Sequence, residues 1–303
     1  MQYEVSGYVQ GGGSASLQIT EQRFKEVRDA KDACLSALEV EEKLALLLDN
    51  FFEFEVELLK LAEQFLLWRD TTHRGMMQDR LLLDRRLVNL LTACRLYLDQ
   101  VDHVVSGIFG SPSAELEQLK AFKNELYDSS LGYRIMEALR NHVQHAGLLV
   151  HIISYDNSKV EGQGHDDWQV VVSPISLVET LSENRKFKKE TLTEIKALGP
   201  KLDLRWCTRD YLSCFSRLHE RARGIIHTRF GPARGVYEQA VAEYSTVDQV
   251  PIQLPRLFEL NEDTSANQEI ALVTEFLKLH DVLREKNKER DYRRSFASNR
   301  SVV

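Results

Sequence analysis

The sequence predicts a mainly α-helical protein: a helical bundle with a small β-hairpin insertion and a helical C-terminal extension. Three observations support this prediction. Apolar residues recur with helical spacing over most of the 303 residues. Two short segments instead have the pattern of strands: one alternates apolar and polar residues, and the other has two apolar stretches around a polar loop. With 43% hydrophobic and 28% charged residues, the composition is that of an ordinary globular protein.

The first alternating segment lies at the N-terminus. Residues 3–9 and 14–20 alternate around the glycines at 11–13, which predicts a β-hairpin or a strand that pairs elsewhere in the chain. A flexible tail is the alternative. Thr20 can cap a lead-in helix, because its hydroxyl can accept a hydrogen bond from the first helical turn. Residues 1–39 are therefore expected to form one N-terminal segment.

Residues 40–147 have the pattern of a helical bundle, with two long amphipathic helices followed by two shorter ones. A Ser-Pro-Ser sequence at 111–113 separates the second helix from the third. Ser130 can cap the fourth helix and Gly147 can end it. The expected helices are 41–69, 78–108, 114–127 and 131–146.

The second segment, 148–175, predicts a β-hairpin, because apolar stretches at 148–155 and 168–172 flank a polar loop that contains two glycines. Residues 176–286 are expected to form a helical C-terminal region. Residues 287–303 are basic and lack apolar periodicity, so a disordered tail is expected there. The helices expected in the C-terminal region are 182–198, 203–244, with a bend or interruption at Gly231-Pro232, and 264–286.

Histidines and carboxylates at the hairpin form a candidate metal site. His165, Asp166 and Asp167 fall in the polar loop, and His151 falls on the first strand. A charged hairpin loop explains these residues better, so neither a metal nor a cofactor is expected. The sequence contains no GxxxxGK[ST], GxGxxG, HExxH or GxSxG motif, which leaves most familiar enzyme classes without support.

Charge and cysteine usage narrow the function classes further. A net charge of −7 argues against a surface built to coat nucleic acid, although it is compatible with a local basic cleft. The four cysteines lie far apart without a CxxC pair, as expected for reduced thiols in a cytosolic protein. No signal peptide and no membrane-spanning apolar run is found. A cytoplasmic protein without a membrane partner is therefore expected.

The helix expected at 131–146 combines a packing face with a face rich in ionisable groups. At about 100° per residue, Ile135, Met136, Leu139, Val143 and Ala146 share one arc. A solvated surface is one explanation for the opposite arc. The polar residues there are Tyr133, Arg134, Glu137, Arg140, Asn141, Gln144 and His145.

Arg140 and His145 give this polar arc a chemical interpretation. An arginine can hold a phosphate, and a histidine can transfer a proton at neutral pH, which are the two operations that RNA cleavage needs. The spacing alone is common, and a second match occurs at Arg221 and His227, which we interpret as chance. His142 lies at the edge of the packing arc and is expected in the core or at an interface.

A bundle with Arg140, Asn141 and His145 near the end of its fourth helix resembles the HEPN superfamily (higher eukaryotes and prokaryotes nucleotide-binding). Glu137 and Gln144 frame the motif, together with Tyr133 and Arg134, and the resemblance covers about residues 40–150. It implies a metal-independent endoribonuclease that acts as a homodimer, with two Arg/His pairs meeting in a cleft. Such an enzyme would fit a toxin–antitoxin or phage-defence system, with an antitoxin or regulatory protein as a further partner.

The expected reaction uses the 2′-hydroxyl of RNA as the nucleophile. His145 would move the proton, and Arg140 would stabilise the charge that grows on the phosphate. Asn141 would orient the histidine or hold the phosphate, and Glu137 would pair with an arginine in the free enzyme. The products would end in 2′,3′-cyclic phosphates. On a regular helix Arg140 and His145 lie about 140° apart, so the two pairs of a homodimer would complete each other.

Other interpretations remain open from the sequence. A basic cluster is either a candidate RNA-contact surface or an exposed face, and it comprises Arg185, Lys186, Lys188 and Lys189. The protein could instead be a non-catalytic HEPN-like module that binds a nucleotide or a protein. In a third interpretation it is a helical adaptor in which Arg140, Glu137 and His145 form a buried polar network.

Overall fold

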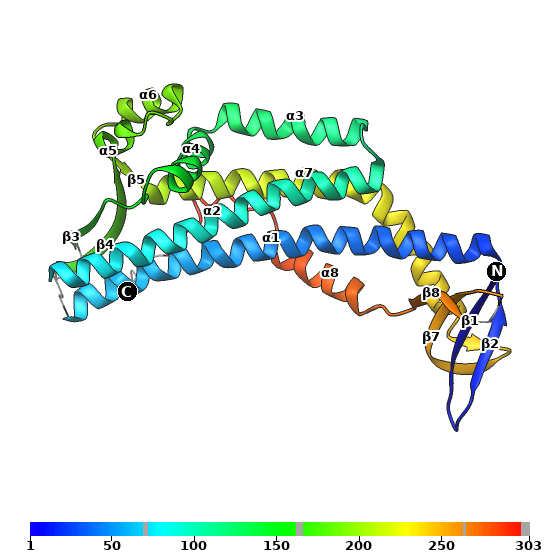
Figure 1. Ribbon diagram of the computed structural model, residues 1–303. Helices are drawn as coiled ribbons and strands as arrows, with labels where there is room; N and C mark the ends of the chain where they lie inside the picture. Colours follow the sequence, from blue (N-terminus) through cyan, green and yellow to red (C-terminus); the bar gives the residue numbers. More distant parts are fainter. Residues whose placement is uncertain (69–71, 162–165, 263–264, 298–303) are drawn as a thin grey trace. The chain divides into compact units, whose positions relative to one another are not determined.

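The computed structural model describes residues 1–68, 72–161, 166–262 and 265–297. In this part of the chain, eight helices and eight strands group into two compact units (Figure 1). The prediction of a mainly α-helical protein is confirmed. The first unit comprises Met1–Glu42, His103–Glu115 and Ala222–Asn287, and the second comprises Lys43–Asp102, Leu116–Arg221 and Lys288–Val303.

Three long helices, α1 (Glu21–Trp68), α2 (His73–Phe109) and α7 (Leu204–Glu243), contribute residues to both units. The sequence predicted two helices where α1 is continuous. The junction of the two predicted helices, near residues 39–41, contains neither Gly nor Pro, and Val40 and Glu41 are both buried there. The boundary expected between residues 39 and 40 therefore lies inside one helix.

Helix α7 is likewise unbroken at Pro232, where the sequence predicted a bend or interruption. A proline removes one backbone donor and crowds the preceding turn, which usually breaks an isolated helix. Here the buried rings of Phe230 and Tyr237 lie on either side of it. Because tertiary packing supplies most of the stability of a helix in a protein, the assigned helix continues through this position.

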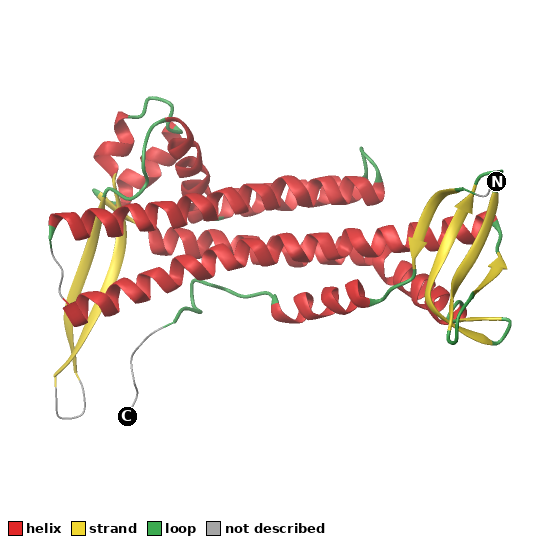
Figure 2. Ribbon diagram, turned by 60° about the horizontal axis from the view of Figure 1, so that its bottom comes forward, coloured by secondary structure: helices red, strands yellow, loops and turns green. Residues whose placement is uncertain are grey.

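A five-stranded antiparallel sheet belongs to the first unit, with the order β2-β1-β7-β6 and with β8 paired to β7 (Figure 2). The predicted N-terminal hairpin is confirmed, since β1 pairs with β2 from Glu4 opposite Gln18 to Tyr8 opposite Ser14. Thr20 caps α1 as predicted, accepting from the backbone N–H of Arg23 at 3.1 Å. The strands are β1 (Gln2–Val9), β2 (Ser14–Gln18), β6 (Thr246–Val247), β7 (Val250–Leu260) and β8 (Ala266–Ala271).

The C-terminal region is not wholly helical, which corrects the sequence prediction. Strands β6, β7 and β8 precede α8, which spans Glu275–Lys286 rather than beginning at residue 264. Two prolines four residues apart, Pro251 and Pro255, each remove a backbone donor and disfavour a helix here. A strand tolerates a proline where that N–H is not needed for pairing. The partner of β7 is β1, about 250 residues earlier in the chain, with Tyr3 opposite Glu259. No local pattern reveals such a distant pairing.

The second unit holds parts of α1, α2 and α7 together with four shorter helices and a three-stranded antiparallel sheet in the order β3-β4-β5. The predicted third and fourth helices are confirmed within one or two residues. The shorter elements are α3 (Ala114–Ser129), α4 (Leu131–His145), β3 (Ile152–Glu161), β4 (Asp166–Leu177), α5 (Val178–Glu183), α6 (Lys189–Leu198) and β5 (Lys201–Asp203).

The β3–β4 hairpin is longer than predicted. The strand ladder continues through most of the segment expected to be a polar loop, with Lys159 opposite Trp168 and Glu161 opposite Asp166. Of the candidate metal ligands, His165 lies outside the described residues. Among the described residues, no group of three His, Cys, Asp or Glu side chains is placed to hold a metal ion.

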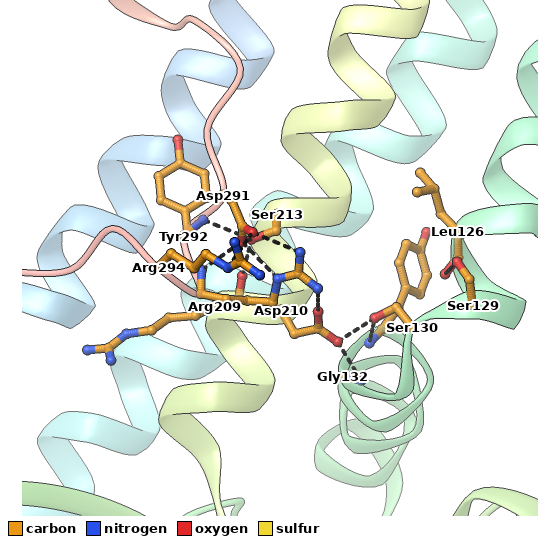
Figure 3. Close-up of polar contacts among 12 residues, drawn as sticks. Leu126, Ser129, Ser130, Gly132, Arg209, Asp210, Ser213, Asp291, Tyr292 and Arg294 are labelled. Atoms are coloured by element: carbon orange, nitrogen blue, oxygen red, sulfur yellow. Dashed lines mark hydrogen bonds and ion pairs between the residues drawn. The ribbon is translucent and has the colours of Figure 1, made fainter.

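The C-terminal segment differs from the disordered tail expected at 287–303. Within the second unit, residues 288–297 run along α7 and are held by backbone hydrogen bonds (Figure 3). The N–H of Arg290 donates to the Ser216 hydroxyl at 2.8 Å, and that of Tyr292 donates to the Ser213 hydroxyl at 2.9 Å. The Tyr292 ring also packs edge-on against Phe51 at 5.1 Å. Residues 298–303 lie outside the described part of the chain.

All four cysteines, Cys34, Cys94, Cys207 and Cys214, are buried free thiols. Burial raises the pKa of each thiol, so none is poised as a nucleophile. In the described part of the chain, no helix has an apolar stretch long enough to cross a membrane.

Candidate functional site

Helix α4 carries the predicted motif and is fixed firmly at its N-terminal end. Ser130 caps the helix, accepting from the N–H of Tyr133 at 3.0 Å. Figure 3 shows Asp210 of α7 beside this cap, accepting from the Ser130 hydroxyl at 2.6 Å and from the N–H of Gly132 at 3.0 Å. A carboxylate in this place satisfies free helix N–H groups and complements the helix dipole. Asp210 therefore anchors α4 to α7.

Gly132 is what allows this close approach. A Cβ at this position would lie 2.6 Å from side-chain atoms of Asp210. The same carboxylate is 3.5 Å from the guanidinium of Arg293 in the C-terminal segment. Residues 78 positions apart in sequence thus meet at the start of the helix, together with a third segment from the chain's end. Local sequence patterns gave no sign of this anchor.

The packing face of α4 follows the prediction, since Ile135, Met136 and Leu139 are fully buried. The placement of Tyr133 on the polar face was wrong, because this ring is only 4% exposed. It lies edge-on to Tyr211 of α7 at a centroid distance of 5.0 Å. Burial raises the pKa of the Tyr133 phenol. Tyr133 is therefore a core residue in this structure.

Arg134 is engaged in holding neighbouring segments together. Its guanidinium donates to both oxygens of Glu194 on α6, at 3.1 and 2.8 Å. It also donates to the backbone carbonyls of Tyr127 and Asp128 at the end of α3. With its fork occupied in this way, Arg134 has little capacity left for a ligand.

Arg140 is held in place by its own helix and remains partly accessible. Its Nε lies 3.4 Å from Glu137, and another guanidinium nitrogen lies 3.5 Å from the amide oxygen of Gln144. The second oxygen of Glu137 accepts a hydrogen bond from the buried hydroxyl of Tyr211. The side chains of Arg140 and Glu137 are each 17% exposed. Both contacts of Arg140 are long, so the guanidinium is oriented while donors remain for a phosphate.

Asn141 and His145 lie at the exposed C-terminal end of α4. Neither side chain makes a hydrogen bond or ion pair to another described residue, and none joins Arg140 to His145. At about 100° per residue, Arg140 and His145 are separated by about 140° around the helix. The structure thus leaves both groups available but does not bring them together within one chain.

His142 is buried, as predicted, on the side of α4 that meets the α5–α6 connection. Its Nδ1 lies 3.0 Å from the side-chain amide of Asn184, and its ring packs against Phe187 at 6.0 Å. Burial lowers the pKa of His142. The ring is therefore neutral at pH 7 and acts as the docking point for this connection.

The α5–α6 connection carries the predicted basic cluster. Phe187 is buried against His142, whereas Arg185, Lys186 and Lys189 are exposed. Lys188 is also exposed but is engaged with Tyr127, donating to the hydroxyl at 2.6 Å with its ammonium over the ring. Two exposed cations, Arg185 and Lys186, therefore lie on a loop that docks onto the α4 motif, and a third, Lys189, begins α6 directly after it.

His151 is a structural residue of the hairpin. Its Nδ1 accepts from the N–H of Leu177 at 2.8 Å, which links the start of β3 to the end of β4. Nearby, the buried Asp84 accepts from the N–H groups of Leu149 and Val150 at 2.8 and 2.9 Å. Desolvation raises the pKa of this carboxyl group. These contacts fix the chain as it leaves α4.

The second Arg/His match does not form a pair. Arg221 lies in the second unit near Gln118 at 3.5 Å, whereas His227 belongs to the first unit. Arg223, between them, forms a buried bidentate ion pair with Glu41 at 2.7 and 2.6 Å.

Comparison with known proteins adds no relative. No protein-family model matches the chain, and no curated protein or solved structure is significantly similar to it.

Proposed function

We propose that the C-terminal half of α4, with Arg140, Asn141 and His145, carries the active site of a metal-independent endoribonuclease. One observation carries the proposal: the α5–α6 connection docks through Phe187 onto His142, within the motif itself, and the exposed cations Arg185, Lys186 and Lys189 lie on this connection and at the start of α6. A backbone-binding surface thus adjoins a group able to transfer a proton. Cations beside a catalytic group suit a polyanionic substrate.

In the proposed reaction, RNA supplies its own nucleophile. His145 removes the 2′-hydroxyl proton, the oxygen attacks the adjacent phosphorus, and the bond to the 5′-oxygen breaks. Arg140, oriented by Glu137 and Gln144, stabilises the charge on the phosphate oxygens. The leaving oxygen takes up a proton, and the product ends in a 2′,3′-cyclic phosphate. Asn141 holds the phosphate or orients the histidine.

The proposal includes a homodimer, because Arg140 and His145 point about 140° apart on one helix. Around a twofold axis, the arginine of one copy would serve the histidine of the other. Such an enzyme would suit a toxin or phage-defence effector that an antitoxin or regulatory protein restrains. Cytoplasmic location is part of the same proposal.

The test is cleavage of a single-stranded RNA in EDTA by wild type, His145→Ala and the matched control His227→Ala. Wild type and His227→Ala should leave cyclic-phosphate ends, whereas His145→Ala should lose at least about 100-fold in rate. RNA with 2′-O-methyl groups should resist cleavage. Mixing inactive Arg140→Ala with inactive His145→Ala should restore up to about a quarter of the activity if sites form across a dimer. A folded wild type that leaves every RNA intact would refute the proposal.

A second candidate function, a non-catalytic helical binding module or adaptor, is favoured by one contact. The Tyr211 hydroxyl donates to Glu137, which in turn pairs with Arg140, as expected for a structural polar network. In that case Arg140→Ala should cost about 3 kcal/mol of unfolding free energy, because a buried charge loses its partner. The ribonuclease proposal expects less than about 1 kcal/mol, since Glu137 keeps Tyr211. Urea unfolding distinguishes the two.

A further inference from the structure

The first unit contains an open groove of about 810 Å³ that is separate from the α4 site. One wall is formed by the first turns of α1, the other by the second half of α7, and the last turn of α2 also lines it. We propose that this groove binds an amphipathic α-helix with a basic edge, presented by a partner protein.

The shape of the groove supports a helical occupant. In this unit α1 and α7 run antiparallel, since Arg23 pairs with Glu243 and Glu41 pairs with Arg223. The end of α2 meets the same two helices where the Arg229 guanidinium lies over the ring of Phe109 at 5.8 Å. Helix α2 stops there, and the space between α1 and α7 continues beyond its end. The groove is thus the place that a third helix would occupy.

The size of the groove agrees with this. The α1 wall extends from Arg23 to Ser36, a length of about 20 Å at 1.5 Å per residue. Its floor is made of small side chains, including Ala30, Ala33 and Ala233. Small residues let a second helix approach closely and leave room for large apolar side chains from the partner.

The charges of the groove specify the edge of the partner. The α1 wall presents three exposed carboxylates, Glu26, Asp29 and Asp32, at successive helical turns. Glu26 lies 3.6 Å from Arg23, which also pairs with Glu243, and Asp29 pairs with Arg28 at 2.8 Å. Asp32 makes no ion pair with another described residue, so it is the carboxylate of this wall most open to a partner's cation. Lysines or arginines along one edge of the bound helix would face this acidic wall. The α7 wall carries a single cation, Arg229, which orients the helix by repelling that edge.

The probe is a fluorescein-labelled helical peptide of about 18 residues, with leucines on one face and lysines along one edge, added to the full chain. Fluorescence anisotropy should show saturable binding. Asp29→Lys with Asp32→Lys should weaken the affinity at least 10-fold and should instead favour the matched peptide with glutamates in place of lysines. The control pair Glu125→Lys with Asp128→Lys has the same spacing on exposed positions of α3 and should leave the affinity unchanged. Ala33→Trp, which fills the groove, should also reduce the affinity at least 10-fold.

Hydrogen exchange locates the bound peptide independently. Protection confined to 26–36 and 228–236 would support the groove as the site. Three results would overturn the proposal: no saturable binding, equal losses with the α3 control pair, or protection elsewhere in the chain. The variant with Asp29→Lys and Asp32→Lys changes only exposed side chains, so it still tests the proposal if the Ala33→Trp protein does not fold. None of these readouts depends on RNA cleavage, so the two proposals stand or fall separately.

Discussion

The two ends of α4 are held in opposite ways. At the N-terminal end, Ser130 and Gly132 are tied to Asp210, and the Arg134 fork is filled by Glu194 and two carbonyl groups. At the C-terminal end, Asn141 and His145 are exposed and make no hydrogen bond to another described side chain. The polar side chains named at the first end are therefore all engaged. At the second end His142 is docked on Asn184, whereas Asn141 and His145 stay open. We call these the anchored end and the open end.

The difference separates structural polar residues from candidate functional ones. A polar side chain whose donors and acceptors are satisfied contributes to stability, and its loss is costly because partners remain unpaired. A polar side chain without such partners, on a backbone that is held in place, keeps its donors and acceptors available for a ligand. Arg140 lies between these cases, since its two contacts are long and its side chain is partly exposed.

The largest effect on stability should come from breaking the anchored end. Asp210→Ala removes the acceptor of the Ser130 hydroxyl and of the Gly132 N–H. We expect the unfolding free energy to fall by about 2 kcal/mol, because both donors are left in a largely buried place. Urea unfolding measures this. Asp210→Asn keeps an acceptor oxygen and should lose less unfolding free energy. If Asp210→Ala is as stable as wild type, Asp210 does not anchor the N-terminal end of α4.

An intermediate effect should come from His142, the buried histidine in the last turn. Burial lowers its pKa, so the unfolded chain binds a proton at a higher pH than the folded one. Stability is therefore complete above the unfolded value of about 6.5 and falls as the pH drops below it. The pKa of His151 and of His280 is shifted the same way by burial, so all three contribute.

The variant His142→Gln measures how much His142 contributes to this pH dependence of stability. The loss of unfolding free energy between pH 7 and pH 5 should be smaller in the variant than in wild type, because the glutamine does not take up a proton on unfolding. Urea midpoints at pH 7, 6 and 5 measure it, and His227→Ala, at an exposed position, serves as the control. Identical pH profiles for wild type and His142→Gln would show that His142 does not carry the shift.

The smallest effect on stability should come from the open end. Asn141→Ala and His145→Ala remove exposed side chains without leaving a described partner unpaired. We expect changes within about 0.5 kcal/mol, measured by the same urea titrations. A loss comparable to that of Asp210→Ala would mean that the open end is structural, and it would weaken the assignment of these residues to a site.

The sequence by itself determined the helical character of the chain, the N-terminal hairpin and the face of α4 that packs. These features depend on local rules: helical periodicity placed Ile135, Met136 and Leu139 in the core, and capping chemistry placed Ser130 at the start of α4. The alternating residues around the glycines at 11–13 likewise predicted the β1–β2 hairpin.

Only the tertiary structure decided the features that depend on distant partners. The pairing of β7 with β1, the burial of Tyr133 against Tyr211, and the anchoring of Gly132 by Asp210 all join residues far apart in the chain. The same holds for the docking of Phe187 on His142, which brings the basic cluster to the motif. The physical reason is that periodicity and capping act within a few turns, whereas the satisfaction of a buried carboxylate or a strand edge depends on which segment folding brings beside it.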